Sequence, residues 1–164
     1  MSACLAGAVD GPASVQPMTV ADLDEVMVLE RAVYAFPWTR GNFVDSLAAG
    51  YIAWVLRDGA AGLIGYSVAM AGVDEMHLLN ITVASGLRRQ GHARRVLNEL
   101  DAAARRAGTS MLWLEVRESN AEARSAYQRL GFAHVGKRKG YYPAVGGRED
   151  AVVMRRATAA AGDG

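Results

Sequence analysis

The chain has 164 residues, of which 51% are hydrophobic, so it is long enough for one core and too short for two comfortable domains. A formal net charge of +1 excludes the basic surface typical of nucleic-acid-binding proteins, and almost all of the local positive charge is arginine, which suits phosphates and carboxylates. Cys4 is the only cysteine in the sequence, so an internal disulfide is excluded. The histidines are scattered along the sequence, so no metal-binding cluster is indicated.

The first elements in chain order are two helices. Residues 1–14 are rich in Ala, Gly and Ser without periodicity, so we expect a disordered segment, a single domain over 15–156 and a disordered tail over 157–164. No signal peptide or membrane span is indicated, and a cytoplasmic location is expected. Thr19 can cap a helix whose apolar stripe is Val20, Leu23, Val26, Met27 and Val33; Pro37 interrupts it, and Thr39 can cap a second short helix.

Strands and a central helix follow. Residues 52–56 and 63–69 read as a hairpin around Asp58-Gly59, although that connection can be longer, and 76–83 reads as the next strand. Residues 93–107 have apolar positions at three- and four-residue steps, which predicts an amphipathic helix that stops at Gly108.

The C-terminal part continues this alternation. Residues 111–116 are almost entirely apolar until Glu115, as in a strand covered on both faces. Ser119 and Glu122 have capping-box spacing for a helix that ends at Gly131. Two further strands are expected over 132–137 and 151–155, with Tyr141-Tyr142-Pro143 in a loop between them. Helices that alternate with hairpin strands indicate an α/β (α+β) domain with a mixed sheet.

The connection from Val83 to the central helix has the properties of an anion site. Gly91 lets the backbone approach a ligand closely, and the first-turn N–H groups and dipole of the following helix favour an anion. Arg88, Arg89, Arg94 and Arg95 crowd positive charge around this end. A surface glycine turn with solvated arginines is the alternative. A Walker A loop is excluded, because no Lys-Ser or Lys-Thr follows the glycine.

These residues also carry a family resemblance. Arg88-x-x-Gly91-x-Ala93 resembles the acetyl-CoA signature of the GNAT acetyltransferase superfamily, although Ala93 replaces the second glycine usual in the most similar proteins. Further stretches resemble RimI-type ribosomal-protein-alanine N-acetyltransferases: 35–38, 113–120, 141–143 and 147–151. The resemblance covers about residues 17–155. It implies a GNAT fold, with a mixed sheet of about six to seven strands, splayed at the acetyl-CoA site and flanked by about four helices.

The resemblance also implies binding residues. Backbone groups of the strand end would contact the acetyl and pantetheine part of acetyl-CoA, and the following loop would wrap its phosphates. The cofactor-binding candidates are Ile81, Thr82, Val83, Arg88, Arg89, Gln90, Gly91, His92, Ala93, Arg94 and Asn120. Asn120 is equally well explained as a helix cap. Substrate-binding candidates are Phe36, Trp38, Tyr141 and Tyr142, although an aromatic break such as 35–38 is often packing.

Glu115 is the candidate base. Strand alternation puts it on the same face as Met111 and Trp113, and a carboxylate at the end of an apolar row is expected to have a raised pKa, which suits a base near neutrality. The alternative is a glutamate that pairs with an arginine at the strand end. The resemblance favours the base, because the Trp-Leu-Glu-Val motif of RimI-type enzymes carries the proton acceptor at this position.

Tyr127 is the candidate acid. A tyrosine on the apolar face of a helix is usually a core residue whose hydroxyl finds a partner. The resemblance implies instead that Tyr127, twelve residues after Glu115, donates the proton to the sulfur of coenzyme A. Without a nucleophilic serine or cysteine, direct transfer through a ternary complex is expected.

The leading hypothesis is an acetyl-CoA-dependent N-alpha-acetyltransferase that acts on a protein N-terminus, by resemblance an alanine-starting ribosomal protein of the small subunit. A lysine side chain or a small amine is the alternative acceptor. A non-catalytic acyl-CoA-binding module is the alternative from another class. No nucleic-acid partner, membrane partner or metal is expected, and the sequence gives no oligomeric state.

Overall fold

The computed structural model describes residues 13–59, 62–87 and 91–158. Its strands are β1 (Ser14–Pro17), β2 (Ile52–Arg57), β3 (Leu63–Ala71), β4 (Glu75–Val83), β5 (Met111–Arg117), β6 (Ala133–Ala144) and β7 (Gly147–Ala157). Its helices are α2 (Leu23–Val33), α3 (Arg40–Ala48), α4 (His92–Arg106) and α5 (Ala121–Arg129), with short 3-10 helices η1 (Val20–Asp22) and η2 (Ser85–Leu87).

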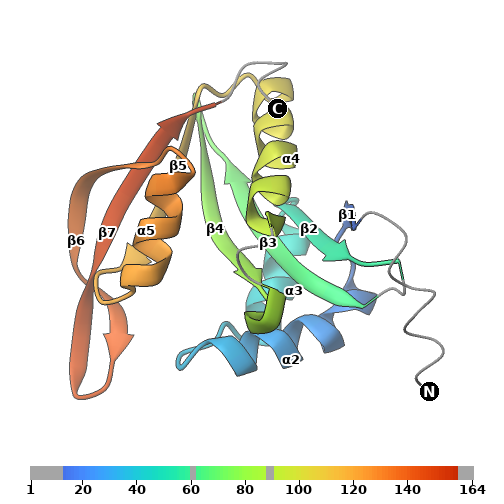
Figure 1. Cartoon of the computed structure of the whole chain (residues 1–164), viewed down its shortest axis with the longest axis horizontal. Helices are drawn as coiled ribbons and strands as arrows, with labels where there is room; N and C mark the ends of the chain where they lie inside the picture. The colour runs from blue at the N-terminus through green and yellow to red at the C-terminus, as the bar shows by residue number, and fades with distance from the viewer. Residues whose placement is uncertain (1–12, 60–61, 88–90, 159–164) are drawn as a thin grey trace. The chain divides into compact units, whose positions relative to one another are not determined.

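These strands form a mixed sheet. Within the described residues it has 7 strands in the order β1-β2-β3-β4-β5-β7-β6 (Figure 1). The β4–β5 pair is parallel, with a register from Glu75↔Met111 to Leu78↔Leu114, whereas the β5–β7 and β6–β7 pairs are antiparallel. The predicted mixed sheet with about six to seven strands and about four helices is confirmed. Its predicted opening at the acetyl-CoA site stays a prediction.

The chain divides into two compact units: a first unit of Met1–Ala69 and Asn80–Glu99, and a second unit of Met70–Leu79 and Leu100–Gly164. In the first unit, one face of α2 is buried through Leu23, Val26 and Met27. The ring of Phe43 lies 5.1 Å from that of Trp38 and 5.8 Å from that of Tyr66. These three rings therefore form an aromatic cluster in the first unit.

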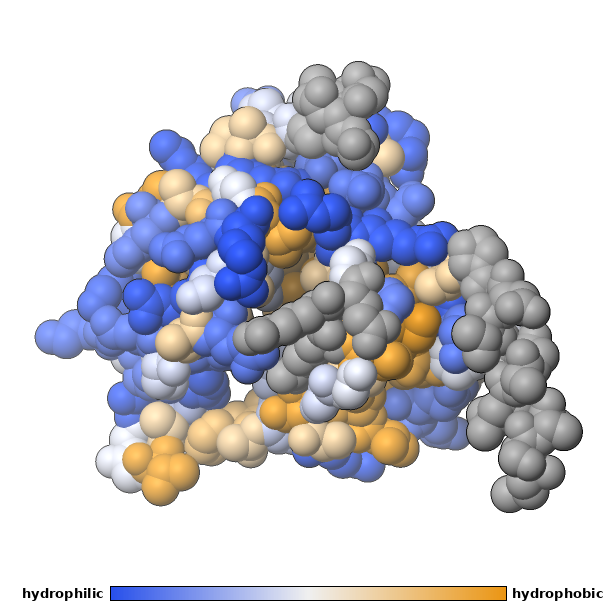
Figure 2. Space-filling model, in the orientation of Figure 1, coloured by the Kyte–Doolittle hydropathy of each residue, from blue (hydrophilic) through white to orange (hydrophobic). Residues whose placement is uncertain are grey.

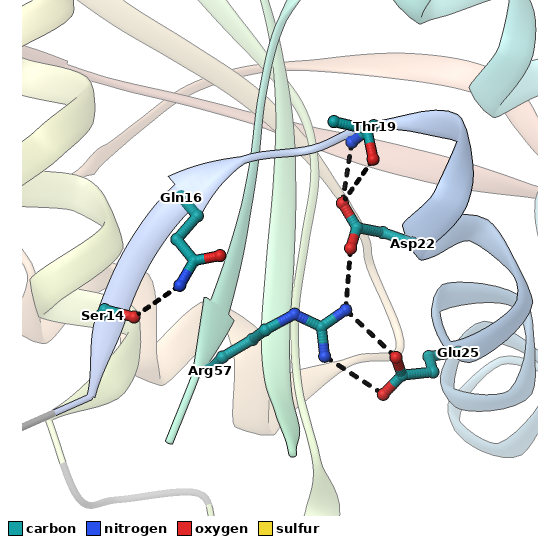
Figure 3. A network of polar contacts seen from close by, with 6 residues as sticks. All are labelled: Ser14, Gln16, Thr19, Asp22, Glu25 and Arg57. Atoms are coloured by element: carbon teal, nitrogen blue, oxygen red, sulfur yellow. Dashed lines mark hydrogen bonds and ion pairs between the residues drawn. The ribbon is translucent and has the colours of Figure 1, made fainter. Parts of the chain in front are cut away.

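Arg57 ties the end of β2 to the start of α2 (Figure 3). Its guanidinium donates to Asp22 at 2.8 Å and to Glu25 at 3.1 Å. Burial raises the pKa of the Asp22 carboxyl, but hydrogen bonds from the Thr19 N–H and from Arg57 outweigh it and hold the pKa below its usual value. The acidic first turn is thus charged where the helix dipole favours a negative charge.

The second unit has its core on one face of β5. Leu112, Leu114 and Val116 are buried, and the alternate residues are half-buried. Antiparallel pairing sets Leu114 opposite Met154 of β7, which is also buried. Asp101 of α4 accepts a hydrogen bond of 2.5 Å from Arg156 of β7. The predicted strand and its alternation, with Glu115 on the face of Met111 and Trp113, are therefore confirmed. The expectation that both faces are covered is wrong, because the residues of this second face are only half-buried.

The predicted elements differ from the structure in several places. β1 was not expected, yet Ser14–Pro17 pairs with Trp54–Arg57 of β2. The predicted loop around Tyr141-Tyr142-Pro143 is wrong, because β6 continues to Ala144 and pairs with β7 beyond an irregularity between Arg138 and Tyr142. Gly140, with a φ of +60°, and Pro143 interrupt the strand pattern in the sequence, and the sheet tolerates Pro143 because β6 is an edge strand.

Two helix starts also differ. The N-cap of α5 is Asn120, whose side-chain oxygen accepts from the Ala123 N–H, and not Ser119. Val20, placed in the first apolar stripe, is 56% exposed because this turn is the 3-10 helix η1. The Thr39 cap is confirmed, since its hydroxyl accepts from the Asn42 N–H at 3.1 Å.

The surface is mostly polar. Figure 2 shows one face, on which hydrophilic residues cover much of the area and hydrophobic residues form separate patches. Large hydrophobic side chains that are exposed include Val20, Val28, Phe36, Val44, Val73, Val135, Tyr141 and Val145. None of the helices in the described ranges is both long enough and apolar enough to cross a membrane.

Candidate active site

The C-terminal end of β4 is held by a polar chain in the first unit. The Tyr34 hydroxyl lies 2.7 Å from Thr82 Oγ1 and donates to the Ile81 carbonyl at 3.3 Å. Thr82 Oγ1 donates in turn to Asn80 Oδ1 at 2.8 Å. A Cβ on Gly65 of β3 would lie only 2.3 Å from the Thr82 carbonyl oxygen, so this glycine permits the close approach of β3. The backbone predicted to contact acetyl-CoA is therefore firmly positioned.

Glu30 of α2 lies at the root of this chain. It is 2% exposed, and its Oε1 accepts from Tyr66 at 2.7 Å and from Asn80 at 2.9 Å. Its Oε2 accepts from the Trp38 N–H at 3.1 Å. Burial raises the pKa of Tyr66 well above its usual value, and the hydrogen bond to Glu30 raises it further. Neutral donors therefore satisfy both oxygens of a buried carboxylate.

The described part of the loop predicted to hold the phosphates has a backbone that suits an anion site. Gly91 has a φ of +82° and nothing within 4 Å of a built Cβ, so its conformation favours glycine and the space beside it is open. The Arg95 N–H donates to the Gly91 carbonyl at 3.0 Å, which leaves the preceding N–H groups of the first turn outside the α4 hydrogen-bond ladder. These features fit a bound phosphate.

The other residues predicted for this loop divide into two groups. His92 and Ala93 are half-buried and Arg94 is exposed at the start of α4. Arg88, Arg89 and Gln90 lie outside the described residues.

Glu115 lies in the second unit beside residues from β4 and β6. Its Oε2 is 2.8 Å from His77 Nε2, its Oε1 is 3.3 Å from Arg138 Nε, and its side chain is 7% exposed. The parallel register places His77 opposite Trp113, two residues before Glu115 on the same face. The arginine pair considered as the alternative to a base is thus present, but a histidine contacts the same carboxylate.

Tyr127 and Asn120 both belong to α5 in the second unit. Tyr127 is half-buried, and its ring meets the buried Phe132 ring edge-on at 5.8 Å, which agrees with a packing role for the ring. Asn120 is the helix cap, so the alternative considered for it is observed. Neither contact assigns or removes the catalytic and cofactor roles that the resemblance implies.

The aromatic substrate-binding candidates lie in different units. Phe36, which is 41% exposed, and the half-buried Trp38 belong to the first unit. Tyr141 and Tyr142 belong to β6 in the second unit, and their rings meet edge-on at 4.9 Å.

Arginines stack on both β6 tyrosines. Arg117 lies 4.6 Å from the centre of the Tyr142 ring, and Arg138 lies 5.3 Å from that of Tyr141. Arg138 therefore links Tyr141 to Glu115, which brings a predicted substrate residue and the predicted base to one guanidinium.

Sequence reasoning missed Glu30, His77 and Arg138. His77 was noted only as one of several scattered histidines, and its contact with Glu115 joins residues 38 positions apart. The polarity of Glu30 on the buried face of a helix was a usable signal, because a buried carboxylate requires partners. Within the described residues, no group of three or more His, Cys, Asp or Glu side chains could hold a metal ion.

Comparison with known proteins specifies the class of protein to which the mixed sheet and the glycine-led start of α4 belong. Residues 23–132 match the model of the Acetyltransferase (GNAT) family. The chain belongs to this family.

Individual relatives show which members of this family the chain is similar to. The chain is 33% identical to ribosomal protein bS18-alanine N-acetyltransferase of Escherichia coli, over 86% of this chain and 95% of that protein. The protein of the same name from Haemophilus ducreyi is 31% identical, over 85% of this chain and 97% of its own length. A crystal structure of the Escherichia coli enzyme superposes with a TM-score of 0.80 at 32% identity, covering 93% and 97% of the two chains.

Proposed function

We propose that this chain transfers an acetyl group from acetyl-CoA to the N-terminal amine of a protein that starts with alanine, in the first instance a ribosomal protein of the small subunit. The observation that carries the proposal is the 33% identity, over nearly the full length, to relatives named for this activity. The residues of the candidate site supply the chemistry. A ribosomal-protein substrate would place the reaction in the cytoplasm.

The β4 end and the start of α4 are proposed to bind acetyl-CoA. Backbone groups of Ile81, Thr82 and Val83 would hold the acetyl and pantetheine part, with Tyr34 fixing the Ile81 carbonyl. The loop from Arg88 to Arg94 would hold the phosphates, and Asn120 is a further contact. Phe36, Trp38, Tyr141 and Tyr142 would contact the peptide.

Glu115 is proposed as the base and Tyr127 as the acid. An N-terminal amine has a pKa of about 7.7–8.0, against about 10.4 for a lysine side chain, so it is the easier amine to deprotonate near neutrality. On going from ammonium to amide, the nitrogen loses two protons. One is balanced by the proton that Tyr127 gives to the departing thiolate and then recovers, and the other leaves for solvent.

A panel of short peptides tests the proposal. The peptides differ in their first residue, some carry internal lysines, and each is incubated with acetyl-CoA and the full chain before mass spectrometry. The proposal predicts a single acetyl group on the α-amine, with the highest yield for an alanine start. Acetyl groups found only on side chains would favour the lysine alternative. No acetylation of any peptide, with acetyl-CoA binding confirmed by calorimetry, would favour a small-amine acceptor or a non-catalytic module.

A further inference from the structure

The proposed reaction releases a proton that the buried base cannot keep. Near neutrality most N-terminal amines arrive as ammonium ions, because their pKa is about 7.7–8.0. Each turnover of an ammonium substrate therefore delivers a net proton to solvent, and the base must lose it before the next cycle. The side chain of Glu115 is only 7% exposed, so a direct exchange with bulk water is restricted.

His77 is placed to take this proton. Its Nε2 lies 2.8 Å from Glu115 Oε2, a hydrogen-bonding distance, and its side chain is 19% exposed. A proton that passed from Glu115 to His77 would therefore move from the less exposed carboxylate to the more exposed imidazole ring. Both residues belong to the second unit, and the β4–β5 register brings them to the same face.

Resting on the proposed function, we propose that His77 is the exit for the substrate proton. An N–H bond of the ammonium breaks as an O–H bond forms on Glu115. Before this step His77 is the neutral tautomer that carries its proton on Nδ1, so Nε2 has a free lone pair. The Glu115 O–H bond then breaks as an N–H bond forms at His77 Nε2, and the imidazolium releases its Nδ1 proton to water. Proton exchange of the neutral ring with water restores the Nδ1–H tautomer before the next turnover. Glu115 returns to a carboxylate and His77 to a neutral ring, so the step needs no other reactant. His77 acts through Glu115 and is a positioning residue for the base.

Arg138 cannot replace His77 in this role. A guanidinium stays protonated up to a pH of about 12 and has no lone pair that accepts a proton. Its Nε, 3.3 Å from Glu115 Oε1, instead fixes the other carboxylate oxygen. Imidazole, in contrast, exchanges protons near neutrality.

The other charged side chains around the pair are glutamates and arginines, residue types whose ordinary pKa values lie outside the neutral range. On the face that Glu115 shares with His77, β4 contributes Glu75, β5 contributes Arg117 and β6 contributes Arg138. β7 contributes Arg155 and also Glu149, which accepts a hydrogen bond from Arg117 at 3.1 Å. Glu75 is exposed at the start of β4, and the guanidinium of Arg155 lies 5.1 Å from the centre of the Trp113 ring. The arginines keep their charge at every pH used below. A pH effect that depends on His77 is therefore not mimicked by these neighbours.

The test compares His77→Gln with His134→Gln in the full chain. Glutamine keeps a donor that can hold Glu115, but it does not carry protons. His134 lies in the same unit on β6 and is exposed, and its Nε2 lies 3.0 Å from the Gly136 carbonyl oxygen. Rates with an alanine-starting peptide are measured at about pH 6.5, where the amine is an ammonium ion, and at about pH 9.5, where it is neutral.

We expect kcat of His77→Gln to fall about tenfold at the lower pH, below the hundredfold or more typical of a group that takes the proton directly. The deficit should nearly vanish at the higher pH, because a neutral amine releases no net proton. His134→Gln should match the unchanged chain at both values. Equal deficits of His77→Gln at both values, or none at the lower one, would overturn the relay.

Rescue by a small base gives a second readout that a structural role would not move. Imidazole in the buffer should restore part of the rate of His77→Ala at about pH 6.5 and leave Glu115→Gln unchanged. A folded His77→Ala whose low rate imidazole does not change would show that the ring is only structural. If the unchanged chain acetylates no N-terminus, the proposed function fails and the relay with it. If that chain is active and only the pH and imidazole effects are missing, the relay alone fails.

Discussion

Glu30 in the first unit and Glu115 in the second are both carboxylates withdrawn from water, and they differ in their partners. Glu30 accepts from a tyrosine hydroxyl, an asparagine amide and a backbone N–H. Glu115 contacts a histidine and an arginine. Neutral donors fix a carboxylate without a route for protons, whereas an imidazole at hydrogen-bond distance can exchange one. Burial alone therefore does not distinguish the proposed base from a structural carboxylate; the two differ in the chemistry of their partners.

Replacement of Glu115 should have the largest effect. We expect Glu115→Gln to lower kcat about 100- to 10,000-fold, or roughly 3–5 kcal/mol of barrier, because glutamine cannot accept a proton. The affinity for acetyl-CoA, measured by calorimetry, should stay nearly unchanged. Glu118→Gln is the matched control, since Glu118 follows the same strand and pairs with Lys137 at a more exposed position. If Glu115→Gln turned over as fast as the unchanged chain, Glu115 would have no part in the mechanism. Its role would then be structural, as we infer for Glu30.

Replacement of Tyr127 should have the second largest effect on turnover. Tyr127→Phe keeps the edge-on ring contact with Phe132 and removes only the hydroxyl, so we expect a loss of about a hundredfold in kcat with little change in thermal stability. Single-turnover rates and a thermal melt distinguish the two effects. A lower melting temperature with an unchanged rate would show that the packing interpretation of Tyr127 is correct.

Replacement of Glu30 should affect stability more than rate. In Glu30→Gln one oxygen becomes an NH2 group that faces a buried donor, which should cost about 1–3 kcal/mol of unfolding free energy. Urea denaturation measures this loss. Glu25→Gln is the control on the same helix, because the Glu25 side chain is 54% exposed and its pair should contribute about 1 kcal/mol or less. A large fall in kcat at unchanged stability would show that Glu30 is functional like Glu115.

Asp22 extends the comparison to a carboxylate paired with an arginine. Of the four replacements, that of Asp22 should have the smallest effect. Because the folded-state pKa of Asp22 is lowered, its stabilisation is present above the unfolded value of about 3.9 and is lost as the pH falls through the folded value. Asp22→Asn should therefore cost about 1 kcal/mol at neutral pH. The difference should shrink in acid. Chemical denaturation at several pH values measures it, and a constant difference would contradict the pKa shift.

Features set by neighbouring residues were predictable. The Thr39 cap, the amphipathic pattern of α4 and the alternation of β5 each depend on residues a few positions apart, and the structure confirms them. The predictions failed where an element depends on a distant partner. Ser14–Pro17 is a strand because β2 pairs with it, and residues 141–143 are in a strand because β7 does.

The same distinction between local and distant determinants applies to Glu30 and Glu115. The sequence by itself determined that Glu115 ends an apolar strand, that its side chain shares a face with Trp113, and that the surrounding motifs belong to an acetyltransferase, because alternation and motifs are local properties. Only the tertiary structure decided the partners. Glu30 and Asn80 are 50 positions apart, and His77 and Glu115 are 38 apart. Which strands become neighbours, and in which register, is set by the burial of the whole sheet, so no local pattern specifies these contacts.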